Sequence, residues 1–488
     1  MSSEKKNHLE YFNSSDQAPF KELPLQKKVK MGLKILANSF PIILTFEAPL
    51  ITGIFNVYFL RSYNNEEMIG GYGIGLDWAH IFLLSISISL NQGLNVLVST
   101  AYGAKDYKLC STYLQRGLLI LYTILIPCFT IMYYSEAFMA YIGIKPVLAR
   151  YAGDLTRQLI PAMILYSGFD LLKSFVSAHK VFYPILFIHI LTLLLHPFWG
   201  WLFIVYFELG ITGVACARFC EEAINLTSLF LYVKNSKHFS ETFLGFQKEV
   251  FNLDQMWSQF KFTMGLASIN FLEYFYFELM NLFGGTFGTK DAVANIAVHE
   301  TSSIAFIFAL GVSLTVMVYI ANSLGEGNAN KAKNYSYIGY FLSIVFGLIL
   351  TGIIYTFRGE WADFWTSSEE IKEYLIKLLL IYAFLILPSD AVNHGSLAAL
   401  KGCGQQLVSS VGLLVCYYCI AAPLGLYLAY GCEMNVLGMW MAYGIADAIL
   451  VMFYSFRVYL LDFNKIVIET KQRLEEDHPK EDTSKNEA

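Results

Sequence analysis

The chain has 488 residues, of which 56% are hydrophobic and 15% charged, and its formal net charge is −5. Charged residues make up about a quarter of a typical soluble protein, so this composition argues against a series of soluble domains. The slight acidic balance gives no indication of a nucleic-acid partner. Apolar stretches of about 20 residues recur along most of the sequence, and they predict an all-α membrane protein.

The two ends of the chain are more polar than its middle. Residues 1–33 lack the apolar core of a signal peptide and residues 461–488 are rich in charge, so we expect a cytoplasmic tail at each end. Between the tails the apolar stretches predict about twelve transmembrane helices. Their expected limits are 36–60, 72–99, 113–134, 151–177, 183–206, 210–233, 258–284, 292–322, 335–357, 372–400, 407–430 and 436–458.

A polar segment at 235–257 divides these helices into two sets of six. We expect an N-lobe over 34–234 and a C-lobe over 258–460, joined by this cytoplasmic linker. Most Lys and Arg residues, with Lys173 and Lys401 counted among them, fall on the side of the linker and both tails, and short cytoplasmic loops are rich in basic residues. We therefore predict a multi-pass protein of the plasma membrane or a vacuole-like membrane with both termini cytoplasmic.

Motifs of the first half recur in the second half. The segment "VSTAYGAKDYKL" aligns with "IANSLGEGNANK", so that Gly103 corresponds to Gly325. The pairs "IP" and "LP", and "ELGITG" and "EMNVLG", recur at nearly the same offset. Two six-helix copies that face the same way predict pseudo-symmetric lobes, an arrangement that transporters use to move two bodies about a central site.

Several carboxylates fall inside the predicted helices, where an ionised side chain costs on the order of 3 kcal/mol. Glu273 and Glu278 lie in "FLEYFYFELM", Glu300 lies in the next predicted helix, and Asp390 lies in the tenth. Five positions on a helix separate Glu273 and Glu278 by about 140°, so they do not share one narrow face. Because intramembrane acids commonly serve transport, we predict proton and substrate binding at Glu278, Glu300, Asp390 and Glu273.

Further side chains near these acids are weaker candidates. His299 and His394 could relay protons, although a histidine that binds a backbone carbonyl is equally common. Glu47 in the first predicted helix is either a cavity residue or an interfacial one, and Asp77 and Asp170 also lie within predicted helices. Three aromatic residues could make cation–π contacts with a substrate or form ordinary packing: Tyr274, Tyr276 and Phe277.

The eight cysteines do not indicate a metal site. Cys216 and Cys220, and likewise Cys416 and Cys419, have helical spacing without the loop context of bound zinc. We therefore expect no metal and no cofactor other than a coupling ion.

Three segments resemble the signature segments of the multidrug and toxic compound extrusion (MATE) family, in its eukaryotic branch. They are "NQGLNVLVSTAYGAKDYKLCSTYLQRGLLIL", "ETSSIAFIFALGVSLTVMVYIANSLGEGNANKAK" and "LAALKGCGQQ". "STAYG" and "LKGCG" depart from the commoner forms of these segments in the family. The resemblance covers about residues 36–458, and it implies twelve helices in two lobes that expel organic solutes in exchange for protons or sodium.

The resemblance also assigns positions to the acids. It implies that Glu273 and Glu278 match the paired acids of the family's seventh helix, Glu300 the acid of the eighth helix, and Asp390 that of the tenth. Together the four acids would form one acidic cavity in the C-lobe. Asn56 stands where bacterial relatives carry a first-helix aspartate. We therefore expect protons as the coupling ion, with sodium as the alternative, and no bacterial carboxylate site in the N-lobe.

These observations predict a monomeric secondary transporter that exports organic cations in exchange for protons by alternating access. Its expected partners are a small organic solute and membrane lipid. One alternative is a lipid or oligosaccharide flippase, which would need a basic cavity, whereas Arg218 is the lone basic residue assigned to a helix interior. A membrane-embedded acyltransferase that uses Asn393 and His394 is a further alternative, and it would have no need of the repeat.

Overall fold

The computed structural model describes residues 23–478, which form helices and connecting turns without a strand. Ten helical segments are long and apolar enough to cross a membrane. Two further long helices, α9 (Ile211–Asn235) and α10 (Leu253–Gly284), carry more acidic and basic side chains and complete a set of twelve. The all-α fold with twelve long helices is thus confirmed.

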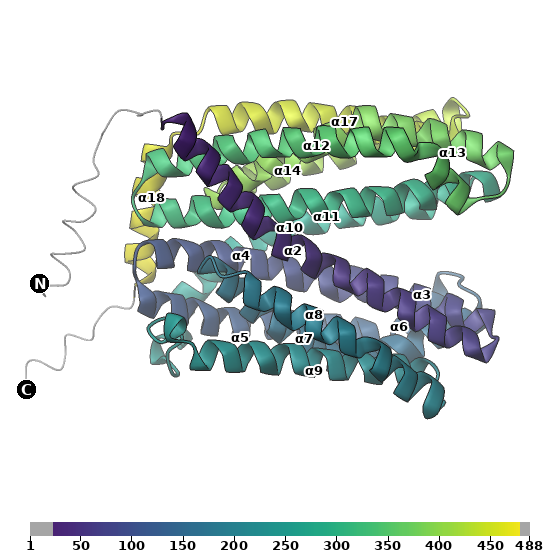
Figure 1. Ribbon diagram of the computed structural model, residues 1–488, viewed down its shortest axis with the longest axis horizontal. Coiled ribbons are helices and arrows are strands. Elements are labelled where there is room, and N and C mark those ends of the chain that lie inside the picture. Colours follow the sequence, from purple (N-terminus) through teal and green to yellow (C-terminus); the bar gives the residue numbers. More distant parts are fainter. Residues whose placement is uncertain (1–22, 479–488) are drawn as a thin grey trace, which may run out of the picture.

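The helices form two lobes, which Figure 1 shows as two bundles lying side by side. The N-lobe contains α2 (Leu25–Leu60), α3 (Glu66–Ala79), α4 (Ser85–Gly103), α5 (Tyr107–Tyr133), the short α6 (Ser135–Tyr141), α7 (Pro146–Ala178), α8 (Tyr183–Gly200) and α9. The C-lobe contains α10, α11 (Thr289–Gly325), α12 (Ala329–Trp365), α13 (Glu369–Ile381), α14 (Leu387–Gly402), α15 (Gln406–Leu413), α16 (Ala422–Leu426) and α17 (Asn435–Tyr459).

Several of these helices are continuous through one wide turn. The segment His80–Leu84 joins α3 to α4, and Tyr382–Ile386 joins α13 to α14. Segments Leu414–Ala421 and Tyr427–Gly431 similarly extend α15 and α16. Wide turns inside helices are frequent at functional sites, and the turn before α14 immediately precedes the helix that carries Asp390.

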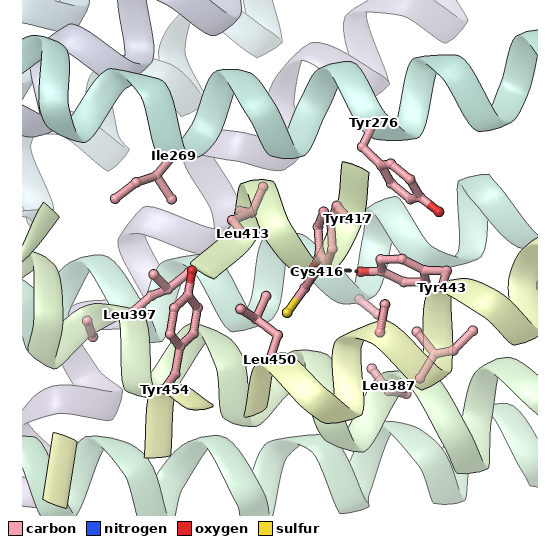
Figure 2. Close-up of a cluster of buried hydrophobic side chains, with 14 of the residues drawn as sticks. Ile269, Tyr276, Leu387, Leu397, Leu413, Cys416, Tyr417, Tyr443, Leu450 and Tyr454 are labelled. Carbon is pink, nitrogen blue, oxygen red and sulfur yellow. Dashed lines mark hydrogen bonds between the residues drawn. The ribbon is translucent and has the colours of Figure 1, made fainter. Parts of the chain in front are cut away.

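Each lobe has its own apolar core. Buried residues such as Leu121, Phe169 and Phe175 form the core of the N-lobe. The core of the C-lobe includes Tyr276 and Trp440, and Figure 2 shows part of it. Two separate cores allow each lobe to keep its internal packing when the lobes move relative to each other.

Helix α2 connects the two lobes, and Figure 1 shows it running diagonally across them. Its first half packs on α11, where Ser39 Oγ donates to Thr315 Oγ1 at 3.0 Å. Its second half packs on α8, where Asn56 Oδ1 lies 3.0 Å from His196 Nε2. A change in either lobe at these positions therefore acts on the same helix.

The repeat-related glycines pack against each other's helices at the ends of α4 and α11. A Cβ added at Gly103 would lie 2.1 Å from the carbonyl oxygen of Asn322, and one added at Gly325 would lie 2.0 Å from that of Thr100. Asn322 Nδ2 also donates to the carbonyl of Ala178 at 3.0 Å. The lobes thus meet here in a reciprocal backbone contact that only residues without a Cβ permit.

Helix α18 (Phe463–Asp477) lies across both lobes at the same end. Phe463 and Ile466 belong to the C-lobe core, whereas Leu474 belongs to the N-lobe core. Asp477 Oδ2 accepts a hydrogen bond of 2.7 Å from Tyr113 OH on α5. Burial raises the pKa of Asp477, against the opposing effects of the Tyr113 hydroxyl and Arg473.

The ends of the chain differ from the expected tails. Helix α2 begins at Leu25, so part of the expected tail at 1–33 is helical, while residues 1–22 lie outside the described residues. In the expected tail at 461–488, α18 buries a stripe of residues spaced three or four apart, which is the pattern of an amphipathic helix. Residues 479–488 also lie outside the described part.

The glycine contact predicts that Gly103→Ala will separate the lobes at this end. The added methyl group meets backbone atoms of α11, and such overpacking typically costs about 1–3 kcal/mol. We expect a lower melting temperature in detergent and a longer spin-label distance between the ends of α4 and α12. Gly352→Ala on α12 is the control, because no heavy atom lies within 4 Å of its added Cβ. Equal behaviour of the two variants would contradict the prediction.

The contact between the two lobes should also depend on pH, because Lys180 lies beside it in the turn after α7. Its Nζ lies 3.5 Å from Glu326 Oε1 at the end of α11, and burial lowers its pKa to about 8, with Glu326 opposing the shift. When the lobes separate, water restores a pKa near the ordinary value of about 10.4. The joined form therefore binds fewer protons between these two values, so raising the pH across this range should favour it.

The measurement is the spin-label distance between the lobes as a function of pH. Lys180→Met removes the titrating amine, so its distance distribution should no longer change above pH 8. A wild-type protein whose lobes separate as the pH rises would show that the attraction to Glu326, not burial, dominates at this position.

Candidate functional site

A group of acids and a histidine lies buried in the C-lobe. Glu273 comes from α10, and Asp390 and His394 lie one turn apart on α14. His394 Nδ1 lies 3.5 Å from Asp390 Oδ1, and Nε2 of the same ring lies 3.9 Å from Glu273 Oε1. His394 also contacts the carbonyl of Asp390 through Nδ1, at 2.9 Å. The imidazole is thus placed between two carboxylates from different helices.

A third acid, Asp447 on α17, extends this group and has no accessible surface. Asn393 Nδ2 donates to its Oδ1, and Tyr417 OH donates to the same oxygen at 3.2 Å. Among the described residues, Oδ2 of Asp447 has no hydrogen-bond partner. The charge of Asp447 interacts with those of Asp390 and Glu273, so the three acids form one electrostatic unit.

Tyrosines surround Asp447 on the side of α10. Figure 2 shows Tyr276, Tyr417 and Tyr443 close together, and the hydroxyl oxygens of Tyr417 and Tyr443 are 3.3 Å apart. The ring of Tyr276 lies 5.1 Å from that of Tyr417 and 5.8 Å from that of Tyr443. Tyr276 is therefore a packing residue of this aromatic cluster, with its ring covered on two sides.

Lys401 supplies the basic charge nearest to the group. This residue of α14 is 5% exposed, and its Nζ donates to Asn270 Oδ1 at 2.8 Å and to Gln92 Oε1 of the N-lobe at 3.3 Å. Its charge interacts with that of Glu273. With three carboxylates against Lys401 and a protonated His394, the group still carries one excess negative charge. A proton or a cationic ligand is therefore needed to neutralise it.

Glu278 and Glu300 do not join this group. They are partly exposed, and the charge of Asp77 on α3 interacts with both of them. Asp77 is exposed and belongs to the N-lobe, so these three acids face each other across the lobes. The structure thus divides the four predicted acids between two groups instead of one cavity: Glu273 lies with Asp390, and Glu278 and Glu300 lie apart from them. The angular separation of Glu273 and Glu278 on the helix is consistent with this division.

Three of the remaining candidates, Tyr274, Phe277 and His299, lie on C-lobe helices. The ring of Tyr274 packs on Phe306, and that of Phe277 packs on His299 and Tyr443. The backbone carbonyl of His299 accepts hydrogen bonds from two serine hydroxyls of α11. Glu47 lies on α2, and its side chain is outside the described part of the structure.

The N-lobe contains a buried charged network that the sequence did not reveal. On α9, Arg218 pairs with Glu221 at 3.3 Å and with Glu222 at 2.8 Å. On α7, Lys173 Nζ forms an ion pair with Asp170 Oδ1 at 2.5 Å. The sequence predicts Lys173 among the basic residues of the cytoplasmic side. The prediction that Arg218 is the lone basic residue within a helix is therefore wrong, since Lys173 and Lys401 are also helical and largely buried.

One atom each of Glu273, Asp390 and His394 lies within 4.8 Å of the others, a spacing that could hold a cation. The donor set includes an imidazole nitrogen, whereas hard cations such as Ca²⁺ and Mg²⁺ take oxygen ligands. Lys401 adds a positive charge beside Glu273, which opposes a second fixed cation. This donor set is therefore poorly suited to a resident Ca²⁺ or Mg²⁺ ion.

Two pseudo-symmetric six-helix lobes around intramembrane acids define a multi-pass membrane transporter. The MatE family model matches residues 41–202 and 266–427, one match in each lobe, and the chain belongs to this family of multidrug and toxic compound extrusion proteins. The two matches begin 225 residues apart, at nearly the offset of the repeated motifs. The resemblance seen in the signature segments is thereby confirmed.

Curated relatives agree with this family over most of the chain. Protein DETOXIFICATION 9 of Arabidopsis thaliana is 24% identical over 383 residues, which cover 76% of this chain and 79% of that protein. Multidrug and toxin extrusion protein 1 of Danio rerio is 22% identical over 398 residues, which cover 81% of this chain and 66% of that protein. These relatives are named for detoxification and extrusion, which leaves the acyltransferase alternative without support.

The fold also agrees with a solved structure. The crystal structure of the eukaryotic MATE transporter AtDTX14 matches with a TM-score of 0.86 at 21% identity, over 92% of this chain and 99% of that one. The similarity establishes the arrangement of the helices in both lobes.

The proximity of Lys401 and Glu273 predicts a strong energetic coupling between them. Lys401→Met should lower the melting temperature, because it leaves the three acids without their nearest fixed cation. Glu273→Gln in the same chain removes one acid and should recover much of that loss. We expect a coupling of about 0.5–3 kcal/mol in a double-mutant cycle. Purely additive changes in thermal unfolding would show that the two charges do not interact.

Proposed function

We propose that the protein exports organic cations in exchange for protons, and that the C-lobe group of Glu273, Asp390, His394 and Asp447 performs the exchange. The observation that carries this proposal is the excess negative charge of the group. Three buried carboxylates face only Lys401 and His394, so the group requires a proton or a ligand cation. The named functions of the relatives support extrusion as the physiological direction.

The exchange follows from mutual exclusion at one buried site. Burial disfavours an ionised carboxylate, so the group binds protons where they are abundant. In the cytosol, loss of a proton restores a negative charge that can bind a cationic solute. On the opposite side, a proton neutralises the same charge and the solute leaves. A net cycle results if the lobes expose the site to one side at a time.

The two acidic groups suit different steps of transport, one of them cation entry and the other proton binding. Glu278 and Glu300 face Asp77 across the lobes and are partly exposed, which suits the first contact of a cation entering between the lobes. The Glu273 group lies deeper and holds the proton. Tyr274 and Phe277 lie between the two groups on α10, where their rings could contact a cation.

We propose protons as the coupling ion because of the composition of the deep group. Its carboxylates keep one excess negative charge even with His394 protonated, one proton neutralises that charge, and Lys401 opposes the binding of a fixed metal cation there. Asn56 further leaves the first helix without the carboxylate expected of a bacterial-type cation site.

We also propose that the two lobes, 34–234 and 258–460, move as bodies in a monomer whose termini and 235–257 linker are cytoplasmic. The concentration of basic residues on that side supports this orientation. The membrane in question is the plasma membrane or a vacuole-like membrane. A lipid flippase is disfavoured because the deep C-lobe group is predominantly acidic.

The decisive measurement is pH-driven uptake of tetraethylammonium into proteoliposomes. Glu273→Gln and Asp390→Asn should each reduce it more than tenfold, since loss of one charge-assisted contact is worth about 1.5–3 kcal/mol. Double variants should be far from additive because the acids act as one group. Glu278→Gln should chiefly weaken apparent substrate affinity.

A matched control is Asp154→Asn on α7, which removes an acid from a partly exposed ion pair with Arg157 outside both groups. Its transport should resemble that of the wild type. Sodium-driven uptake at equal pH, or wild-type transport by a folded Glu273→Gln protein, would overturn the proposed exchange.

A further inference from the structure

The buried network of the N-lobe contains a histidine whose two ring nitrogens face two different partners. His196 on α8 has no accessible surface. Its Nε2 lies 3.0 Å from Asn56 Oδ1 on α2, and its Nδ1 lies 3.2 Å from Glu221 Oε2 on α9. Among the described residues, Nδ1 has no other polar partner.

The orientation of the Asn56 amide places the ring proton of His196 on Nε2. Asn56 Nδ2 donates to Tyr72 OH at 3.3 Å, so Oδ1 is the atom that faces His196. A carbonyl oxygen can only accept, so with the amide of Asn56 in this orientation Nε2 of His196 carries a proton. A neutral imidazole has a single ring proton, which leaves Nδ1 as an acceptor.

Glu221 is also an acceptor when it is ionised, so Nδ1 and an ionised Glu221 would present two lone pairs to each other. One additional proton resolves this conflict, either on the ring, which then becomes an imidazolium, or on the carboxyl group. Both placements put the same proton between Nδ1 and Oε2.

The charges of the network independently indicate one additional bound proton. Arg218 is positive, and Glu221 and Glu222, which are 4% and 1% exposed, are both within its reach. These three groups carry one excess negative charge. Asn225 Nδ2 donates to Glu222 Oε2 at 3.2 Å but adds no charge. One proton makes the buried network neutral, which removes the cost of an unbalanced charge in an apolar interior.

Several other ionisable groups face the network from the surrounding helices. Tyr72 and His80 approach the network from α3 and the turn after it, Tyr166 from α7, and His189 from α8. Lys173 on α7 is the remaining nearby cation, and it is engaged by Asp170 at 2.5 Å.

We propose that the N-lobe holds a second proton-binding site, in which one exchangeable proton is shared between His196 and Glu221. The site is separate from the acids of the C-lobe and exists whether or not those acids drive transport. It borders α2 through Asn56, and α2 also packs on the C-lobe through Ser39. Gain or loss of this proton therefore changes the charge beside the helix that links the two lobes.

The site can be tested by solid-state NMR of the full chain in liposomes with ¹⁵N-labelled histidine. The chain has nine histidines, and His196→Gln identifies the signal in question. We expect two protonated ring nitrogens at neutral pH. In Glu221→Gln, only Nε2 should stay protonated. If the shared proton instead lies on Glu221, the ring of His196 should be neutral and the infrared spectrum should contain a protonated-carboxyl band. Glu221→Gln should abolish that band, and this result would also support the site.

A rescue variant separates a charge effect from a loss of structure. Asn56→Asp in the Glu221→Gln protein places a carboxylate at Nε2 and should restore the doubly protonated ring. Glu273→Gln in the C-lobe should leave the His196 signal unchanged, even if it abolishes transport. A neutral His196 beside an ionised Glu221 in the wild-type protein would overturn the proposal, whatever the outcome for the C-lobe.

Discussion

Unbalanced charge in an apolar interior is the constraint on which the sites of this protein depend. A membrane-spanning protein has few ways to reduce the cost of a buried carboxylate: a fixed cation, hydrogen-bond donors or a proton. In the C-lobe, the charge of Lys401 and the hydrogen bonds that Asn393 and Tyr417 donate stabilise the buried carboxylates in part. In the N-lobe, Arg218 does so for two glutamates. The C-lobe group keeps one excess negative charge even with His394 protonated, and the N-lobe network keeps one with His196 neutral. A proton or a cationic ligand can neutralise each of them.

The lobes are built to keep these charges buried while their mutual contact changes. The reciprocal packing of Gly103 and Gly325 brings two helix backbones together with no side chain between them. Such a contact can form and break without repacking either core. Lys401 adds a polar link across the same interface, because its Nζ reaches Gln92 of α4 as well as Asn270 of its own lobe. Separation of the lobes would break the hydrogen bond between Lys401 and Gln92, and the interaction of Lys401 with Glu273 would then be stronger.

The helices and the repeat could be predicted from sequence because both depend on local patterns. Apolar runs of sufficient length identify helices, and the motif offset identifies the second copy. Helical geometry also indicated that Glu273 and Glu278 do not share one narrow face, but it did not indicate that Glu278 would lie apart from Asp390. Glu221 and Glu222 were missed although they lie three and four residues after Arg218, a spacing at which opposite charges meet on a helix. That spacing was the available signal.

Other parts of the site could not be predicted because they depend on tertiary contacts. Asp447 resembles any other lone acid in an apolar helix, and only the packing of α17 against α14 brings it to Asn393. Lys401 was assigned to the cytoplasmic loops, since a basic residue near a helix end has the same local pattern whether it faces water or an interior acid. The helical pattern of α18 was present in the charged C-terminal segment, yet only the fold shows that its stripe bridges both lobes.

The position of α2 gives the two lobes a physical means of influencing each other. A proton at His196 acts on the second half of α2, whereas the first half contacts α11, the helix that also carries Glu300. Pro41 and Pro49 interrupt the hydrogen-bond ladder between these halves, and a helix interrupted in this way can change its bend at low cost. A charge change in one lobe can thus alter the bend of a helix that the other lobe must accommodate. Coupling between distant sites needs an element that both sites bias, and α2 borders the His196 site and also packs on α11 of the C-lobe.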